Sequence, residues 1–166
     1  MTGMADSLMA APYQRGCQQQ GRLTRVALRR TLAAMDGQAK NPMARALAAA
    51  EVAADRGEVP VGAVVVDGAG TVLAEAGNRV RAHCDPTAHA ELLAIRAAAA
   101  SRGEPRLPDC DLYVTLEPCA MCAQAIAFAH IRRVYFGAYD PKGGGVEHGA
   151  RIFEWPTCHW RPEVYG

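Results

Sequence analysis

Ala-rich stretches with helical spacing alternate along the chain with short β-branched runs, and turn residues separate them. Asn41-Pro42 is typical of a helix N-cap followed by Pro at the first helical position. The Ala-rich stretch that follows favours a helix as far as Arg56, where Gly57 provides a C-terminal stop. The next apolar run, residues 61–66, is continuous and β-branched, and it predicts a buried strand.

A return strand and a second helix come next. Residues 67–70 have the composition of a turn, so residues 71–76 are expected to run back beside the first strand. Thr87 then stands where a helix N-cap is expected, before an Ala-rich stretch over residues 88–101 that Gly103 ends. These signals predict a hairpin followed by a helix.

The remaining elements complete an α/β pattern. Alternating apolar residues predict a third strand over residues 111–116, and residues 133–137 predict a fourth. Between them, Pro118 opens a third helix that runs to about Ala129. The order helix, strand, helix, strand implies parallel crossovers, with helices that cover the sheet. Beyond Asp140 the chain shows no clear periodicity and is expected to be largely loop.

Residues 1–40 differ in composition from the rest of the chain. They carry six Lys and Arg against two Asp and Glu, whereas residues 41–166 carry twelve against fifteen. Residues 22–35 have the Arg-rich, acid-poor character of a transit peptide, but a disordered extension or a start codon assigned too early is the favoured interpretation. We therefore place one domain over residues 41–166. Its mildly acidic balance argues against a broad electrostatic surface for nucleic acid, though not against a local patch.

Neither a membrane span nor a secretory signal is expected. No apolar run approaches the ~18–20 residues of a membrane span, and no hydrophobic region follows the N-terminus, so the expected location is the cytoplasm. The six Cys are too few and too irregularly placed for a disulfide framework in a chain of 166 residues. Two of them belong to the motif described next. We expect the other four to be free thiols in a reducing compartment: Cys17, Cys84, Cys110 and Cys158.

Two short segments carry the candidate chemistry, His89-Ala90-Glu91 and Pro118-Cys119-Ala120-Met121-Cys122. One His and two Cys give zinc three protein ligands and leave the fourth tetrahedral position for water. Both segments fall at predicted helix N-termini, whose partial positive charge favours thiolate over thiol. The spacing of three places the two sulfurs of Cys119 and Cys122 on one face of the helix. The order H-x-E then P-C-x-x-C is the signature of zinc-dependent nucleobase deaminases.

Glu91 lies beside these ligands without joining them. Zinc lowers the pKa of bound water to roughly 7, and Glu91 would take the proton of that water, deliver it to the ring nitrogen and protonate the leaving ammonia. Two alternatives are less favoured. A closed structural zinc site, with a fourth ligand from His83, Cys84 or Cys110, leaves Glu91 idle. A redox C-x-x-C leaves the His-Ala-Glu segment unexplained.

At these residues the chain resembles the cytidine/deoxycytidylate deaminase superfamily, and within it the bacterial tRNA adenosine deaminases of the TadA type. The resemblance spans about residues 41–150. The matching segments are Glu58–Ala63, Gly77–Arg79, Asp85–Glu91, Tyr113–Cys122 and Val134–Ala138, followed by Asp140 and Lys142. It implies a cytidine-deaminase-like fold, a three-layer α/β/α arrangement around a mixed sheet of about five strands. It also implies one zinc per chain.

The resemblance implies substrate-binding roles for three further residues. Asn78 would hydrogen-bond the flipped base, Asp140 would touch the backbone or sugar of the target nucleotide, and Ala90 would belong to the same binding site. Both polar residues also suit turns, since Asn78 follows Gly77 and Asp140 precedes a Pro. These alternatives stay open at the level of the sequence.

The function implied is hydrolytic deamination of adenosine to inosine at the wobble position of a tRNA anticodon. One alternative is a deaminase of a free nucleobase or nucleoside (guanine, cytosine or cytidine), and a second is a non-catalytic partner subunit, which the presence of Glu91 argues against. The family's basic C-terminal helix has no counterpart before Gly166, so weakened tRNA binding is expected. A homodimer is implied too, and an apolar face of the third helix around Ala123, Ile126 and Ala127 supports it.

Overall fold

The computed structural model describes residues 41–166, and their first element is the helix α2 (Pro42–Asp55). The side-chain oxygen of Asn41 accepts hydrogen bonds from the backbone N–H groups of Met43 at 3.0 Å and Ala44 at 3.4 Å, which confirms the predicted N-cap. Gly57 follows the helix with φ 74°, a left-handed conformation that glycine adopts without strain. The predictions for residues 1–40 lie outside the described residues.

Five strands form one mixed sheet in the order β2-β1-β3-β4-β5. β1 is antiparallel to both β2 and β3, whereas β3, β4 and β5 run parallel to one another. The predicted hairpin and the predicted parallel crossover are therefore both confirmed. The strands are β1 (Gly62–Val66), β2 (Val72–Gly77), β3 (Asp111–Val114), β4 (Arg133–Phe136) and β5 (Glu163–Tyr165).

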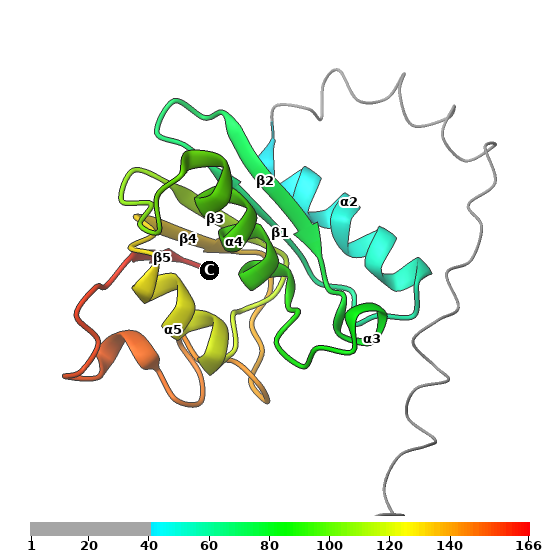
Figure 1. The fold of residues 1–166 in the computed structure, drawn as a ribbon. Coiled ribbons are helices and arrows are strands. Elements are labelled where there is room, and N and C mark those ends of the chain that lie inside the picture. Colours follow the sequence, from blue (N-terminus) through cyan, green and yellow to red (C-terminus); the bar gives the residue numbers. More distant parts are fainter. Residues whose placement is uncertain (1–40) are drawn as a thin grey trace, which may run out of the picture.

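Helices cover the two faces of this sheet (Figure 1). α4 (Ala90–Arg102) and α5 (Ala120–Phe128) lie on one face, and α2 lies on the other. Successive side chains of β1 alternate between them, since Val64 packs in the cluster below α2 and Val65 packs in the main core with α4 and α5. The predicted three-layer α/β/α arrangement is confirmed.

α2 lies close against β1 and β2 because glycines face it. A Cβ at Gly62 would stand 2.0 Å from the carbonyl oxygen of Ala46, and one at Gly77 would stand 2.4 Å from that of Ala49. Any side chain at either position would push the helix away from the sheet. These contacts fix the middle of α2 against the sheet near the end of β2 at Gly77.

The helix starts differ slightly from those predicted. Thr87 does not cap α4, because its hydroxyl donates to the Asp85 carboxylate at 2.7 Å. His89 is the N-cap of α4 and Cys119 is the N-cap of α5, and neither side chain makes a capping hydrogen bond. Both side chains point into the candidate site instead.

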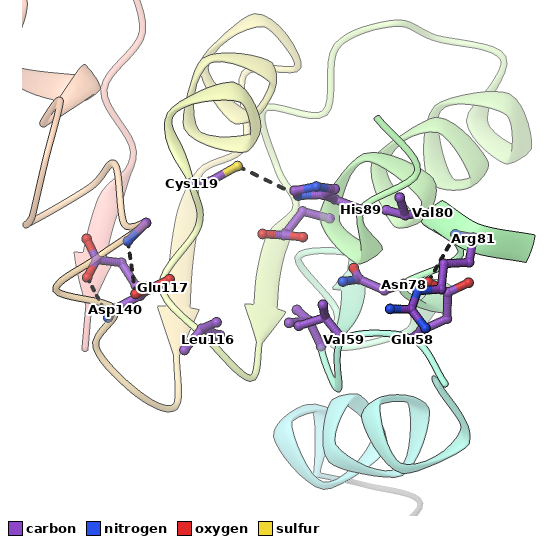
Figure 2. Close-up of a pocket in the computed structure, with 13 residues that line it drawn as sticks. Glu58, Val59, Asn78, Val80, Arg81, His89, Leu116, Glu117, Cys119 and Asp140 are labelled. Atoms are coloured by element: carbon purple, nitrogen blue, oxygen red, sulfur yellow. Dashed lines mark hydrogen bonds between the residues drawn. The ribbon is translucent and has the colours of Figure 1, made fainter. Parts of the chain in front are cut away.

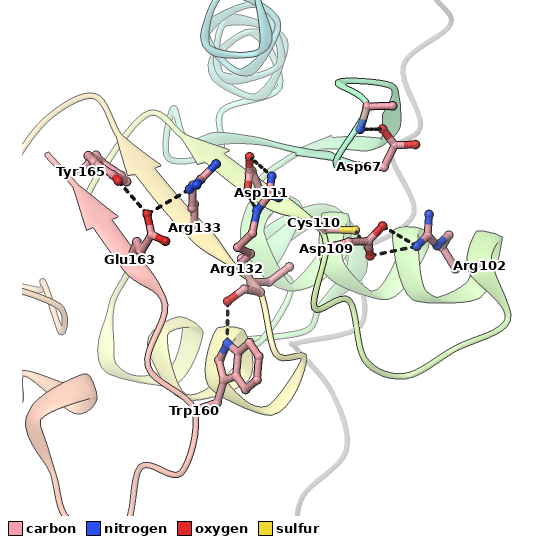
Figure 3. A network of polar contacts seen from close by, with 12 residues as sticks. Asp67, Arg102, Asp109, Cys110, Asp111, Arg132, Arg133, Trp160, Glu163 and Tyr165 are labelled. Atoms are coloured by element: carbon pink, nitrogen blue, oxygen red, sulfur yellow. Dashed lines mark hydrogen bonds and ion pairs between the residues drawn. The ribbon is translucent and has the colours of Figure 1, made fainter.

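Three short elements were not predicted. They are α3 (Val80–His83), a 3-10 turn η3 (Ile152–Glu154) and the strand β5, which pairs with β4 so that Arg133 stands beside Glu163. Figure 3 shows the side-chain contacts at β5, the edge strand of the sheet. Arg133 Nε donates to Glu163 Oε2 at 3.0 Å, and the Tyr165 hydroxyl donates to the same oxygen at 2.7 Å.

The apolar face of α5 that was expected to mark a dimer surface is internal. Ala123 and Ile126 are fully buried and Ala127 is 4% exposed, and all three belong to the main core. The interpretation was wrong because this apolar face of α5 packs entirely against the sheet and α4. The outward side of α5 ends in Phe128, which is 73% exposed.

The Cys outside the motif behave in two ways. Cys110 and Cys158 are free and buried, as expected. Cys84 is disulfide-bonded, which contradicts the expectation for that residue, and Cys17 lies outside the described residues. None of the helices in residues 41–166 combines the length and the hydropathy of a membrane span.

Candidate active site

The N-termini of α4 and α5 bring three donor side chains together. His89 Nδ1 lies 3.7 Å from the Sγ atom of Cys119 and 3.6 Å from that of Cys122. The donor atoms of all three residues lie within 4.8 Å of one another. The predicted ligand set is thus assembled from two helix starts about thirty residues apart in the sequence.

These distances fit a zinc ion. A tetrahedral zinc with bonds of about 2.3 Å to sulfur and about 2.0 Å to nitrogen separates the two ligand atoms by about 3.5 Å. The observed sulfur–nitrogen separations of 3.6 and 3.7 Å are close to this value. Within residues 41–166 no fourth His, Cys, Asp or Glu joins the cluster, so the closed structural site with His83, Cys84 or Cys110 is not formed.

The pKa values of the Cys119 and Cys122 thiols are shifted in opposite directions. A hydrogen bond from Cys122 lowers the pKa of Cys119 to about 5, and backbone N–H groups at the start of α5 act in the same direction despite burial. The same hydrogen bond, together with burial, raises the pKa of Cys122. A thiolate is therefore favoured at Cys119 even before a cation is considered, as expected at a helix N-terminus.

Glu91 stands beside the three donors as a buried carboxyl group. It is 3% exposed, and its Oε2 atom has no hydrogen-bond partner among the described residues. Burial raises its pKa, and the nearby charge of Cys119 adds to that effect. A buried polar atom without a partner is costly, so this oxygen is poised for a group that enters the site.

A cavity of about 400 Å³ opens onto these residues (Figure 2). It is a typical size for a small-molecule pocket, and most of its surface is apolar, with Val59, Val61 and Leu116 among the lining. Figure 2 shows His89 and Asn78 on one side of it and Cys119, Glu117 and Asp140 on the other. The volume suits a single purine or pyrimidine base.

Asn78 is held in one orientation on the pocket wall. It is 4% exposed, and its Oδ1 accepts a hydrogen bond from the backbone N–H of Ala90 at 2.8 Å. Its amide nitrogen is therefore the atom that remains to donate to a ligand. Ala90 is fully buried and is not part of the pocket lining, so its visible role is to orient Asn78.

Asp140 lines the pocket, but its carboxylate also closes a turn. Oδ1 accepts from the backbone N–H groups of Lys142 at 3.1 Å and Gly143 at 3.0 Å. The two interpretations left open by the sequence are thus compatible for this residue, because Oδ2 has no such turn contact. The contacts of Asn78, Ala90 and Asp140 with a substrate stay predictions.

Glu117 is a residue whose role the sequence did not reveal. Its side chain is fully buried, and it accepts hydrogen bonds from the backbone N–H groups of Asp140, Val146, Glu147 and His148 at 2.9–3.2 Å. The His148 ring nitrogen Nδ1 lies 2.7 Å away as a further donor. Burial tends to raise the pKa of Glu117, but these donors together lower it to about 2.

Glu117 thereby ties the loop 140–148 to the start of α5. A Cβ at Gly144 would stand 2.5 Å from the Glu117 carboxylate, so the loop approaches it too closely for any side chain there. Glu58 acts similarly on the opposite wall, where it accepts from the N–H groups of Arg81 at 3.2 Å and Ala82 at 2.9 Å in α3. In the sequence, Glu58 and Glu117 were marked only by lying in segments that resemble the deaminase family.

Known proteins resemble this chain in sequence and fold. Residues 36–138 match the family described as the cytidine and deoxycytidylate deaminase zinc-binding region. A protein of Agrobacterium fabrum named tRNA-specific adenosine deaminase is 58% identical over 123 residues, which cover 74% of this chain and 80% of that protein. One of Rickettsia felis with the same name is 44% identical over 124 residues, covering 74% and 86%.

Two solved structures show the same likeness. One, from work on A-to-I editing by tRNA:A34 deaminases at the wobble position of transfer RNA, is 58% identical with a TM-score of 0.73 and covers 75% of this chain and 89% of its own. The guanine deaminase from Bacillus subtilis is 41% identical with a TM-score of 0.57, covering 59% and 62%.

Proposed function

We propose that this chain, which belongs to the cytidine and deoxycytidylate deaminase family, is a zinc-dependent hydrolase that converts adenosine to inosine at the wobble position of a tRNA anticodon. The deaminase domain is residues 41–166. The observation that carries the proposal is Glu91, a buried carboxyl group with an unpartnered oxygen beside three zinc-binding atoms, in a chain 58% identical to a tRNA-specific adenosine deaminase.

His89, Cys119 and Cys122 would hold one zinc ion per chain. When bound, zinc supplies a Lewis acid that lowers the pKa of a water ligand to roughly 7. Three protein donors would leave room for that water, as in catalytic rather than structural zinc sites. Both helix N-termini add partial positive charge to the same region.

Glu91 moves the protons in the proposed reaction. Its carboxylate takes a proton from the attacking water, the new C6–O bond forms, and the proton passes to the adjacent ring nitrogen. Glu91 then takes the remaining proton from the new C6 hydroxyl and delivers it to the amine. The C6–N bond breaks, the C6 carbonyl of inosine forms, and the amine leaves as ammonia. Burial suits this role because it raises the pKa of Glu91 and makes the carboxylate a better proton acceptor than an exposed one.

Asn78 and Asp140 would position the nucleotide. Because Ala90 occupies Oδ1 of Asn78, the Asn78 amide nitrogen donates to an acceptor on the base edge, such as a ring nitrogen. Asp140 retains Oδ2 for a ribose hydroxyl while Oδ1 closes its turn. The apolar lining at Val59, Val61 and Leu116 would enclose the flat base.

We further propose that two copies of the chain associate through the outward face of α5. Met121, Ala125 and Phe128 stand at helical spacing on that face, and Phe128 is 73% exposed. Phe128→Ser should shift the assembly toward monomer in sedimentation at micromolar concentration. A wild-type chain that sediments as a monomer at every concentration would contradict the dimer. The tRNA substrate would be met in the cytoplasm.

A free-base deaminase is the competing function, since the guanine deaminase from Bacillus subtilis is 41% identical to this chain. The two are separated by single-turnover assays on an anticodon stem-loop with adenosine at the wobble position, run beside adenosine, cytidine, cytosine and guanine. Inosine formed in the loop, with little ammonia from the free compounds, supports the proposal. Ammonia from a free base with no inosine in the loop would transfer the function to that base.

A further inference from the structure

A basic groove of about 460 Å³ crosses the open edge of β2, separate from the pocket that holds the zinc-binding residues. Residues of α2, β2 and α4 line it, with the short segment between β2 and α4 at one end. Arg45, Arg56, Arg79 and His83 contribute basic side chains to the lining, and Glu75 is the one carboxylate in it. This local charge contrasts with the acidic balance of residues 41–166 as a whole.

Two of the arginines make no direct ion pair with the described residues. Arg45 is paired with Glu75 at 2.7 Å, which neutralises both charges. Arg56 and Arg79 make no ion pair with any of residues 41–166. The pKa of Arg56 is lowered by partial burial and by the nearby positive charge of Arg79, and the carboxylates of Glu58 and Asp55 offset this only in part. An anion between the two guanidinium groups would relieve this repulsion.

The groove and the pocket meet at Asn78. Arg56 Nη2 donates to the backbone oxygen of Asn78 at 3.2 Å, whereas the side chain of Asn78 lines the pocket beside Glu91. Arg79, the next residue in the chain, lines the groove and not the pocket. An anion in the groove would therefore lie one residue along the chain from the group that orients the base.

We propose that Arg56 and Arg79 bind backbone phosphates of the same RNA whose target base enters the pocket. The proposal rests on the proposed function, since a free base carries no phosphate. Guanidinium groups suit phosphodiesters because their planar donors match the phosphate oxygens, and such contacts set the register of a nucleic acid without reading its sequence. The shared wall at Asn78 favours RNA over a protein partner, because a base in the pocket is covalently joined to phosphates just outside it.

The test is the salt dependence of RNA binding. Equilibrium binding of an anticodon stem-loop is measured in the Glu91→Gln background, in which turnover is too slow to disturb the measurement, over roughly 50–200 mM salt. The logarithm of the binding constant is plotted against the logarithm of the salt concentration. Arg79→Gln should make the slope of this plot shallower by about 0.7, the value for one phosphate contact on a single strand. The double variant, Arg56→Gln with Arg79→Gln, should make it shallower by about twice that amount. Arg79→Lys should restore most of the slope. Arg106→Gln, the same change at an exposed position before β3, should leave it unaltered.

The outcomes separate the groove from the function. An unaltered slope in both the Arg79→Gln chain and the double variant, with zinc content intact, overturns the groove as a phosphate site. A changed sedimentation coefficient with an unaltered slope overturns it too, and assigns the groove to a protein contact. A shallower slope supports the groove as a phosphate site. If the wild-type chain at the same time forms no inosine, the proposed function is rejected and the phosphate site is not. Inosine formation with an unaltered slope rejects the groove alone.

Discussion

Two carboxyl groups beside the pocket are buried, whereas two arginines of the groove are exposed. Glu91 is 3% exposed and the Glu117 side chain is fully buried, but Arg56 and Arg79 lie at the surface. Burial shifts the pKa values of the pocket residues and limits the geometry that they can adopt. Exposed guanidinium groups keep their charge, and salt screens their attraction for phosphate.

The contrast indicates a division of labour along the short segment Asn78-Arg79. In the proposed mechanism the chemistry depends on buried groups, and backbone hydrogen bonds hold Asn78 and Glu117 in place. Affinity for a polyanion depends on exposed charges, which need no exact geometry. Changes in the pocket should thus alter turnover or stability, and changes in the groove should alter binding and its salt dependence.

The largest effect is expected from the zinc ligands. Cys119→Ala and Cys122→Ala should each lose zinc and all measurable turnover, and should lower the stability of the fold, because metal binding is coupled to folding. Metal analysis together with thermal unfolding checks this. Cys110→Ala removes a buried free thiol outside the site and should keep its zinc. Zinc retained at one equivalent in both ligand variants would contradict the assignment.

Glu91→Gln should leave zinc and fold intact while turnover falls by about 10²–10⁴-fold, the usual contribution of a general acid–base group. Single-turnover inosine formation and metal content, measured on the same preparation, test this. Glu104→Gln is the matched control, since Glu104 is exposed and lies outside the pocket. Turnover near that of the wild type in the Glu91 variant would reject the mechanism.

Glu117 is expected to affect stability more than chemistry. Its pKa is lowered from 4.5 to about 2 in the folded chain, so the ionised form stabilises the fold by about 3 kcal/mol at neutral pH. That contribution is present above the unfolded pKa, starts to fall near pH 4.5 and is lost as pH drops through about 2.

Urea unfolding of wild type and Glu117→Gln across this pH range measures the difference. The gap in free energy of unfolding should be widest at neutral pH and should narrow steadily as the pH falls below 4.5. A gap that stays constant with pH would show that Glu117 acts through its shape and not through its charge.

The elements with local signals were predictable from the sequence. Asn41 caps α2 and Gly103 ends α4 because each acts on backbone groups a few residues away. Thr87 misled the prediction, since its hydroxyl binds Asp85 and leaves His89 as the N-cap. The short α3 and β5 have too few residues to show a period.

The clustering of His89, Cys119 and Cys122 was predictable because their spacing is itself the signal. Glu117 was not, because its partners lie 23–31 residues away in a loop without periodicity. The link from Arg56 to Asn78, 22 residues apart, was hidden for the same reason. His89 and Cys119 occupy N-cap positions, but their side chains make no capping hydrogen bond. A local rule that fails in this way is expected at functional sites.

The separation of chemistry from affinity can be measured on the unmodified chain. Single-turnover inosine formation is followed on a stem-loop with adenosine at the wobble position, over a range of RNA concentrations at several salt concentrations. The account predicts that the RNA concentration for half-maximal rate rises steeply with salt, while the rate at saturating RNA stays nearly constant. A saturated rate that falls with salt, at an unchanged half-maximal concentration, would contradict it.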